Sequence, residues 1–150
     1  MKTYTRTVGG TTVTITDATD DVIKAMESAI ERGLEACGMQ AENYAKKNIT
    51  NAHRIDTGRL RNSITHYSVR RPNGRDEYIG TAVEYAPYIE YGTGIYASNG
   101  MGKQEPWVYK DEKGKWHWTR GIEPIHFLQR AAQNHKRKYQ SIIKDSLENA

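Results

Sequence analysis

The chain has 150 residues, of which 37% are hydrophobic and 27% charged, with a formal net charge of +4. This length favours one domain, and the low hydrophobic share predicts a core that is thin or that a partner completes. The lone cysteine, Cys37, excludes an internal disulfide, and no apolar run approaches the about 18 residues of a membrane span. We therefore expect a protein that is made in the cytoplasm, has no membrane contact and is less basic than a dedicated nucleic-acid binder.

Residues 1–16 predict an N-terminal β-hairpin, because two Thr-rich runs flank Gly9 and Gly10, which can adopt the φ angles of a tight turn. Residues 17–50 predict a long helix, which Asp17 can cap. Its apolar residues recur at spacings of three and four and are Val22, Met26, Ile30, Leu34, Cys37, Ala41 and Tyr44 or Ala45. A helix of about 45 Å exceeds the needs of one small core, so part of this stripe should face another element or subunit.

Residues 51–93 predict a corner followed by a small antiparallel sheet. In "NAHRIDTGRLRNSI", Asp56 or Thr57 can cap one helical turn, and Gly58 keeps the entry open. The alternating run "SITHYSVRR", the turn "PNGRD" and the run "EYIGTAVEY" predict a second hairpin. Its last strand should run into a short helix, because Pro87 suits a first helical turn and Gly92 suits a helix end.

Glu90 stands among three tyrosines at this strand exit, which indicates a partly buried carboxylate. Such a carboxylate needs a hydrogen-bond donor or a cation. Our hypothesis is that Arg59 or Arg61 from the corner pairs with Glu90. A solvated glutamate on a surface turn is the alternative.

Residues 94–122 predict a loop that carries a protruding hairpin, since a glycine-rich run precedes two aromatic runs around a Lys-Gly turn. Large aromatic residues outside the main core are enriched at protein interfaces. The interface candidates are therefore Trp107, Tyr109, Trp116 and Trp118. The alternative is that these rings pack onto their own domain.

Residues 123–150 predict a C-terminal helix, which starts at Pro124 and has one apolar stripe. Lys136, Arg137 and Lys138 make part of its surface basic. These three residues are candidate phosphate contacts. The alternative is that they form only the solvated face of an amphipathic helix.

The sequence shows no catalytic or metal-binding constellation. None of the five histidines pairs at zinc-ligand spacing with a third ligand nearby. No nucleophile stands next to a base, and the glycines of residues 94–102 lack the spacing of a phosphate-binding loop. We therefore expect no enzymatic activity, no cofactor and no metal.

Three segments in order, "IDTGRLRNSI", "IGTAVEYAPYIEYGTG" and "EPIHFLQRAA", give the chain a family resemblance over residues 20–148. It resembles the minor tail or neck components of tailed bacteriophages, small proteins also described as tail-completion proteins. The resemblance implies an α+β fold, in which a long N-terminal helix and a C-terminal helix pack a small antiparallel sheet. The motif residues carried over are Asp56, Thr57, Gly58, Leu60 and Arg61 in the corner and Tyr85, Ala86, Tyr88, Glu90, Tyr91, Gly92 and Thr93 at the strand exit.

The resemblance also implies a structural role in the virion, without catalysis. We expect a ring subunit at the head–tail neck or tail-completion site that joins or stabilises head and tail, or alternatively a tail terminator subunit. Its partners would be other copies of itself and the connector, head-closure, tail terminator or tube proteins, with DNA contact as an option. An alternative of another class is a nucleic-acid-binding module that uses the basic C-terminal helix.

Overall fold

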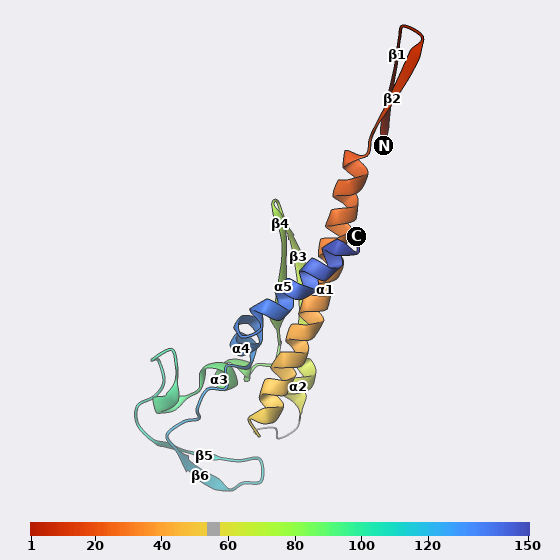
Figure 1. Ribbon diagram of the computed structural model, residues 1–150. Coiled ribbons are helices and arrows are strands. Elements are labelled where there is room, and N and C mark those ends of the chain that lie inside the picture. The colour runs from red at the N-terminus through yellow and green to blue at the C-terminus, as the bar shows by residue number, and fades with distance from the viewer. Residues whose placement is uncertain (54–57) are drawn as a thin grey trace.

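Helix α1 (Thr19–Asn51) is the axis along which the rest of the chain is arranged (Figure 1). The computed structural model describes residues 1–53 and 58–150. It shows the predicted α+β fold, with three two-stranded antiparallel hairpins, one long helix and C-terminal helices. The other elements are β1 (Lys2–Val8), β2 (Thr11–Asp17), α2 (Arg59–Ser63), β3 (Thr65–Arg71), β4 (Gly74–Gly80), α3 (Ala86–Tyr91), the 3-10 turn η1 (Gly94–Tyr96), β5 (Trp107–Lys110), β6 (Trp116–Thr119), α4 (Phe127–Gln133) and α5 (Lys136–Glu148).

The N-terminal hairpin β1–β2 confirms the role predicted for the glycine pair. Val8 pairs with Thr11, and Gly9 and Gly10 have φ angles of 59° and 81°, as a two-residue turn requires. The hairpin touches no core, since every residue from 1 to 17 is exposed. It continues the axis of α1 away from the rest of the molecule (Figure 1).

The second predicted hairpin, β3–β4, is also confirmed and packs against α1. Its last strand ends at Gly80, earlier than the predicted run to Tyr85. The Thr81 hydroxyl accepts a hydrogen bond from the Val83 amide at 3.1 Å and contacts the Ser63 hydroxyl at 2.6 Å, so the chain turns there. Helix α3 then begins as predicted, with Pro87 in its first turn.

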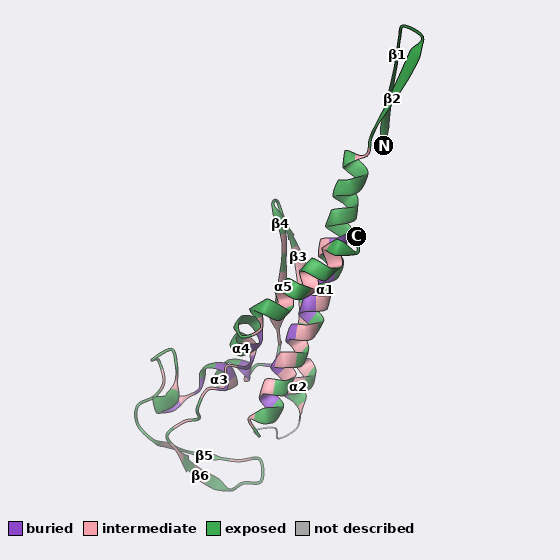
Figure 2. Ribbon diagram, in the orientation of Figure 1, coloured by how far each residue is buried: buried purple, intermediate pink, exposed green. Residues whose placement is uncertain are grey.

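The core lies around the C-terminal half of α1 (Figure 2). Phe127, the only phenylalanine, is fully buried there. The members of the core are Ala45, Ile49, Leu60, Ile64, Val83, Ala86, Ile125, Phe127 and Ala131. These residues come from helices α1 to α4 and from the segments next to them, so the core joins residues 45–86 to residues 125–131.

The face that α1 buries matches the predicted stripe at Cys37, Ala41 and Ala45 but differs from it near the start of the helix. Val22 and Met26 are 54% and 48% exposed, whereas the buried residues of α1 are Ala29, Gly33, Cys37, Gly38, Ala41, Ala45 and Ile49. Most of these are small because α5 lies close: a Cβ on Gly33 would stand 3.0 Å from the Ile143 Cδ1 atom. Cys37 is buried, and its thiol donates to the Tyr139 carbonyl at 3.6 Å.

The predicted C-terminal helix is two helices, α4 and α5. His135 between them has non-helical backbone angles, and its ring stacks on Tyr44 with centroids 3.4 Å apart. The Tyr139 hydroxyl donates to the Ala131 carbonyl across the break at 2.5 Å. These contacts hold a bend that helical periodicity alone does not reveal. Burial raises the pKa of Tyr139 to about 12.

Candidate assembly surfaces

Glu90 in helix α3 is a buried capping residue for helix α4. The residue is 5% exposed, and its carboxylate accepts hydrogen bonds from the backbone amides of Leu128 at 2.9 Å and Gln129 at 3.0 Å. The hypothesis that Arg59 or Arg61 pairs with Glu90 is therefore wrong. The first amides of a helix have no partner within the helix and carry partial positive charge, so they satisfy the carboxylate without an arginine.

The corner does contact the strand exit, but through Arg59 and Glu84. The Arg59 guanidinium donates two hydrogen bonds of 3.1 Å to the two Glu84 oxygens and lies 5.8 Å from the Tyr85 ring centroid. Hydrogen bonds from its own backbone amide and from Arg59 lower the pKa of the exposed Glu84 carboxyl. An exposed pair of this kind positions the chain and contributes little to stability.

The remaining corner residues divide into buried and partly exposed ones. Leu60 is 7% exposed, Gly58 has the left-handed φ of 72°, and Arg61 is half-buried. Asp56 and Thr57 lie outside the residues that the structure describes. The structure thus places Leu60 in the core and leaves the capping role of Asp56 or Thr57 a prediction.

At the strand exit, Tyr88 and Tyr91 project outward, with exposures of 60% and 47%. Ala86 is buried and Tyr85 packs against the core. The exit is closed by the returning chain: the Thr93 amide donates to the Ile122 carbonyl at 2.9 Å. Gly92 is needed here, because a Cβ would collide with that passing backbone.

The aromatic hairpin, residues 107–119, projects from the opposite end of the molecule to β1–β2 (Figure 1). Trp116 and Trp118 are 65% and 63% exposed, so packing onto their own domain, the alternative reading, does not describe these two rings. Trp107 is half-buried and Tyr109 is exposed. The four interface candidates thus lie on one projecting hairpin, with both exposed tryptophans on β6.

Asp111 stabilises the turn of the aromatic hairpin. Its carboxylate accepts hydrogen bonds from the amides of Lys113 at 2.9 Å and Lys115 at 2.8 Å and contacts the His117 Nε2 atom at 2.7 Å. These interactions, led by the His117 contact, lower the pKa of Asp111. The exposed tryptophans therefore stand on a hairpin with a fixed local conformation.

The N-terminal arm, residues 1–28, is a second unpartnered surface. In the β1–β2 register every cross-strand pair on one face is Thr–Thr, for example Thr5 with Thr14. The opposite face carries four apolar residues, Tyr4, Val8, Val13 and Ile15, which are 54% to 64% exposed, together with Lys2, Arg6, Thr11 and Asp17. A two-stranded hairpin is marginally stable alone, so an amphipathic one with a bare apolar face is suited to packing on a partner.

An apolar groove of about 1220 Å³ lies between α1, β4 and α5. The apolar side chains that line it include Leu34, Ala41, Ile79, Tyr139, Ile143 and Leu147. Because α1 is unbroken from residue 19 to 51, the N-terminal arm cannot fold back into the groove of its own chain. The N-terminal arm and the apolar groove of one chain therefore do not contact each other.

The basic residues Lys136, Arg137 and Lys138 are all exposed on α5. Lys136 borders the apolar groove. Exposure fits both phosphate contact and a solvated helix face, so phosphate contact stays a prediction.

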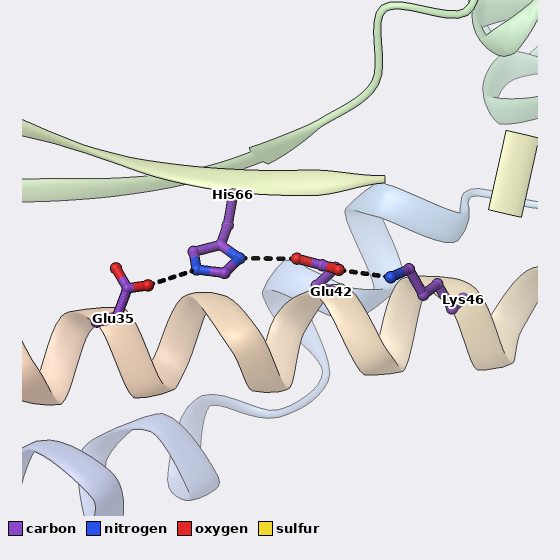
Figure 3. A network of polar contacts seen from close by, with 4 residues as sticks. All are labelled: Glu35, Glu42, Lys46 and His66. Atoms are coloured by element: carbon purple, nitrogen blue, oxygen red, sulfur yellow. Dashed lines mark hydrogen bonds and ion pairs between the residues drawn. The ribbon is translucent and has the colours of Figure 1, made fainter. Parts of the chain in front are cut away.

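A polar cluster that the sequence reading missed joins α1 to β3 (Figure 3). The His66 Nδ1 atom lies 2.7 Å from Glu42 Oε2, and its Nε2 atom lies 3.1 Å from Glu35 Oε1. These hydrogen bonds, the one to Glu42 first, raise the pKa of His66, and the Lys46 ammonium beside Glu42 lowers the pKa of that carboxyl. The signal was available: Glu35 and Glu42 are seven residues apart, on one helix face.

More than half of the chain matches a known protein family. Residues 15–92, more than half of the chain, match the family model HK97-gp10_like, described as "Bacteriophage HK97-gp10, putative tail-component". This span includes α1, the corner and the strand exit and stops before the aromatic hairpin. No curated protein and no solved structure matches. Among the described residues, no helix is both long and apolar enough to cross a membrane.

Proposed function

The chain belongs to the HK97-gp10-like family of bacteriophage tail components, and from this premise we propose that it is a ring subunit at the head–tail neck or tail-completion site. There it joins or stabilises head and tail as a structural protein, without catalysis. Its neighbours are other copies of itself and the connector, head-closure, tail terminator or tube proteins. A tail terminator subunit is the alternative within the same class.

The observation that carries this proposal is the unpartnered pair of the N-terminal arm and the apolar groove. A projection on one side of a subunit and a receptor on another side make a heterologous contact, which repeats from copy to copy and closes into a ring if the rotation allows. The arm of one copy then lies in the groove of the next, which buries the apolar face of β1–β2. The aromatic hairpin remains free to contact a different virion protein.

Two matched variants test the self-assembly step. Val13→Asp with Ile15→Asp places charges on the apolar face of the hairpin, and Thr12→Asp with Thr14→Asp places the same charges on the threonine face. Sedimentation of the wild-type chain should show an oligomer, which the first variant loses and the second retains. A wild-type chain that stays monomeric at the highest attainable concentration, or equal assembly of both variants, contradicts this step.

Electron microscopy of lysates from a phage with this gene disrupted tests the position in the virion. Filled heads beside unjoined tails of normal length support the neck or tail-completion role. Tails of irregular length support the terminator alternative. Intact joined particles contradict both.

A further inference from the structure

Three side chains with metal-ligating groups meet where the β3–β4 hairpin packs on α1. They are Glu35 from α1, His66 from β3 and Glu77 from β4, and one ligand atom of each lies within 4.8 Å of the others. The His66 Nε2 atom is already 3.1 Å from Glu35 Oε1. Ligands about 2.0–2.2 Å from a zinc ion in tetrahedral geometry stand about 3.3 Å from one another, close to the distance between the His66 and Glu35 atoms.

The histidine ring is oriented as metal-bound imidazoles usually are. Glu42 Oε2 accepts from His66 Nδ1 at 2.7 Å, and Lys46 holds the other Glu42 oxygen (Figure 3). A carboxylate on one ring nitrogen fixes the tautomer and leaves the other nitrogen to bind a metal. His66 therefore presents Nε2 toward Glu35, and a Glu77 oxygen belongs to the same cluster.

A buried acceptor without a partner points into the same place. The Ser68 hydroxyl donates to Glu77 Oε2 at 2.7 Å, but Glu77 Oε1 is buried and has no hydrogen-bond partner among the described residues. An unsatisfied buried carboxylate oxygen is costly, and a cation would satisfy it.

A glycine in α1 makes room for this cluster. A Cβ on Gly38 would collide with Glu77 Oε1 and with the His66 ring. Glycine inside a helix destabilises it by about 0.5–1 kcal/mol relative to alanine. Its presence at residue 38 therefore has a spatial reason, which is the space occupied by the two ligands.

We propose that Glu35, His66 and Glu77 bind one divalent transition-metal ion, best matched by Zn²⁺, which ties the β3–β4 hairpin to α1. One imidazole and two carboxylates suit zinc better than magnesium or calcium, which take oxygen ligands, and leave a fourth position to water. The ion links α1 to strands that are 31 residues (Glu35 to His66) and 42 residues (Glu35 to Glu77) further along the chain. This site is independent of the proposed place in the virion.

Zinc titration of the metal-free full chain tests the site. The chain is prepared without a polyhistidine tag, stripped with a chelator and titrated with Zn²⁺ by calorimetry at mildly alkaline pH, where imidazole is neutral. We expect one saturable ion per chain and a higher melting temperature with Zn²⁺ than with chelator. Excess Mg²⁺ should not compete.

Carboxylate variants assign the ligands. Glu77→Gln and Glu35→Gln should each weaken zinc binding at least about tenfold, whereas Glu84→Gln, an exposed carboxylate outside the cluster, should not. Co²⁺ bound to the wild-type chain should give the visible absorption of a low-coordinate site, and both ligand variants should lose it. The Glu35 side chain is 59% exposed, so Glu35→Gln should not disturb folding. This variant therefore tests the metal-ligand assignment even if Glu77→Gln does not fold.

Two results would overturn the proposal. The first is the absence of saturable binding by the wild-type chain. The second is equal zinc affinity in the wild-type, Glu35→Gln and Glu84→Gln chains, which would place the ion elsewhere on the surface.

Discussion

The first ten residues of helix α1 (residues 19–28) and the rest of the helix (residues 29–51) carry different apolar residues and meet different surroundings (Figure 2). From residue 29 onward the buried residues are mostly small, such as Gly33 and Ala41, because α4 and α5 approach closely. Before residue 29, Val22, Ile23 and Met26 are larger and 48% to 54% exposed. Small residues thus mark contacts within the chain, and large exposed ones mark a surface suited to a contact outside it.

Truncation of Phe127 in the core should have the largest effect on stability, and truncation in the N-terminal arm should have almost none. Phe127→Ala should lower the free energy of unfolding by about 3–5 kcal/mol, since Phe127 is fully buried. Ile15→Ala in the N-terminal arm should change it by less than about 0.5 kcal/mol in the monomer. Urea unfolding at concentrations below assembly measures both. Similar losses would mean that the arm is packed within its own chain.

Removal of the Glu90 charge should have the next largest effect. Glu90→Gln keeps the shape but weakens two charge-assisted hydrogen bonds to the start of α4, so we expect a loss of about 1.5–3 kcal/mol. Glu84→Gln is the matched exposed control and should leave stability nearly unchanged. Thermal unfolding of both variants measures the difference. An unchanged melting temperature for Glu90→Gln would show that the cap contributes nothing.

Thiol labelling compares the two halves of α1 directly. Burial raises the pKa of the Cys37 thiol, so the natural chain should react slowly with a thiol reagent. Val22→Cys, made together with Cys37→Ala, should react at least about tenfold faster as a monomer, because residue 22 is exposed. Assembly at higher concentration should slow the reaction of this variant if the arm docks on a second copy. Equal rates in monomer and oligomer would exclude residue 22 from the contact.

The smallest effect concerns the basic surface of α5. If Lys136, Arg137 and Lys138 contact phosphates, the logarithm of the affinity for duplex DNA should fall with the logarithm of salt with a slope of about −2.7. Replacing all three by glutamine should remove this binding. Fluorescence anisotropy with a labelled duplex measures it, and the absence of binding at low salt would leave these residues as a solvated face.

The local conformation of the chain was predictable where one residue type dictates it. Gly9 and Gly10 require a tight turn, and Pro87 and Gly92 fit the start and end of α3. The buried face of α1 was predictable at Cys37, Ala41 and Ala45, but not before them. There Val22 and Met26 are more hydrophobic than Ala29 and Gly33, and only the proximity of α5 selects the smaller pair.

The candidate sites, too, could be predicted from the sequence only in part. The sequence correctly indicates that Glu90 is buried and needs a hydrogen-bond donor. The donors are the backbone amides of Leu128 and Gln129, which the residue types of a sequence do not identify. The cluster of Glu35, His66 and Glu77 draws on three elements, so its ligands have no common spacing. The sequence left open whether the aromatic rings of residues 107–118 are exposed or packed on their own domain, and the structure shows that Trp116 and Trp118 are exposed.

The segment that carries the aromatic hairpin leaves the core at Thr93 and returns to it at Ile122. Thr93 and Ile122 are joined by two hydrogen bonds, of 2.9 Å from the Thr93 amide and 3.0 Å to the Thr93 hydroxyl. Gly94 and Gly121 lie beside them so closely that neither has space for a Cβ. No member of the core lies between residues 95 and 120, and this segment is outside the span matched by the family model. A change of length or sequence in this segment should therefore leave the contacts of the core in place.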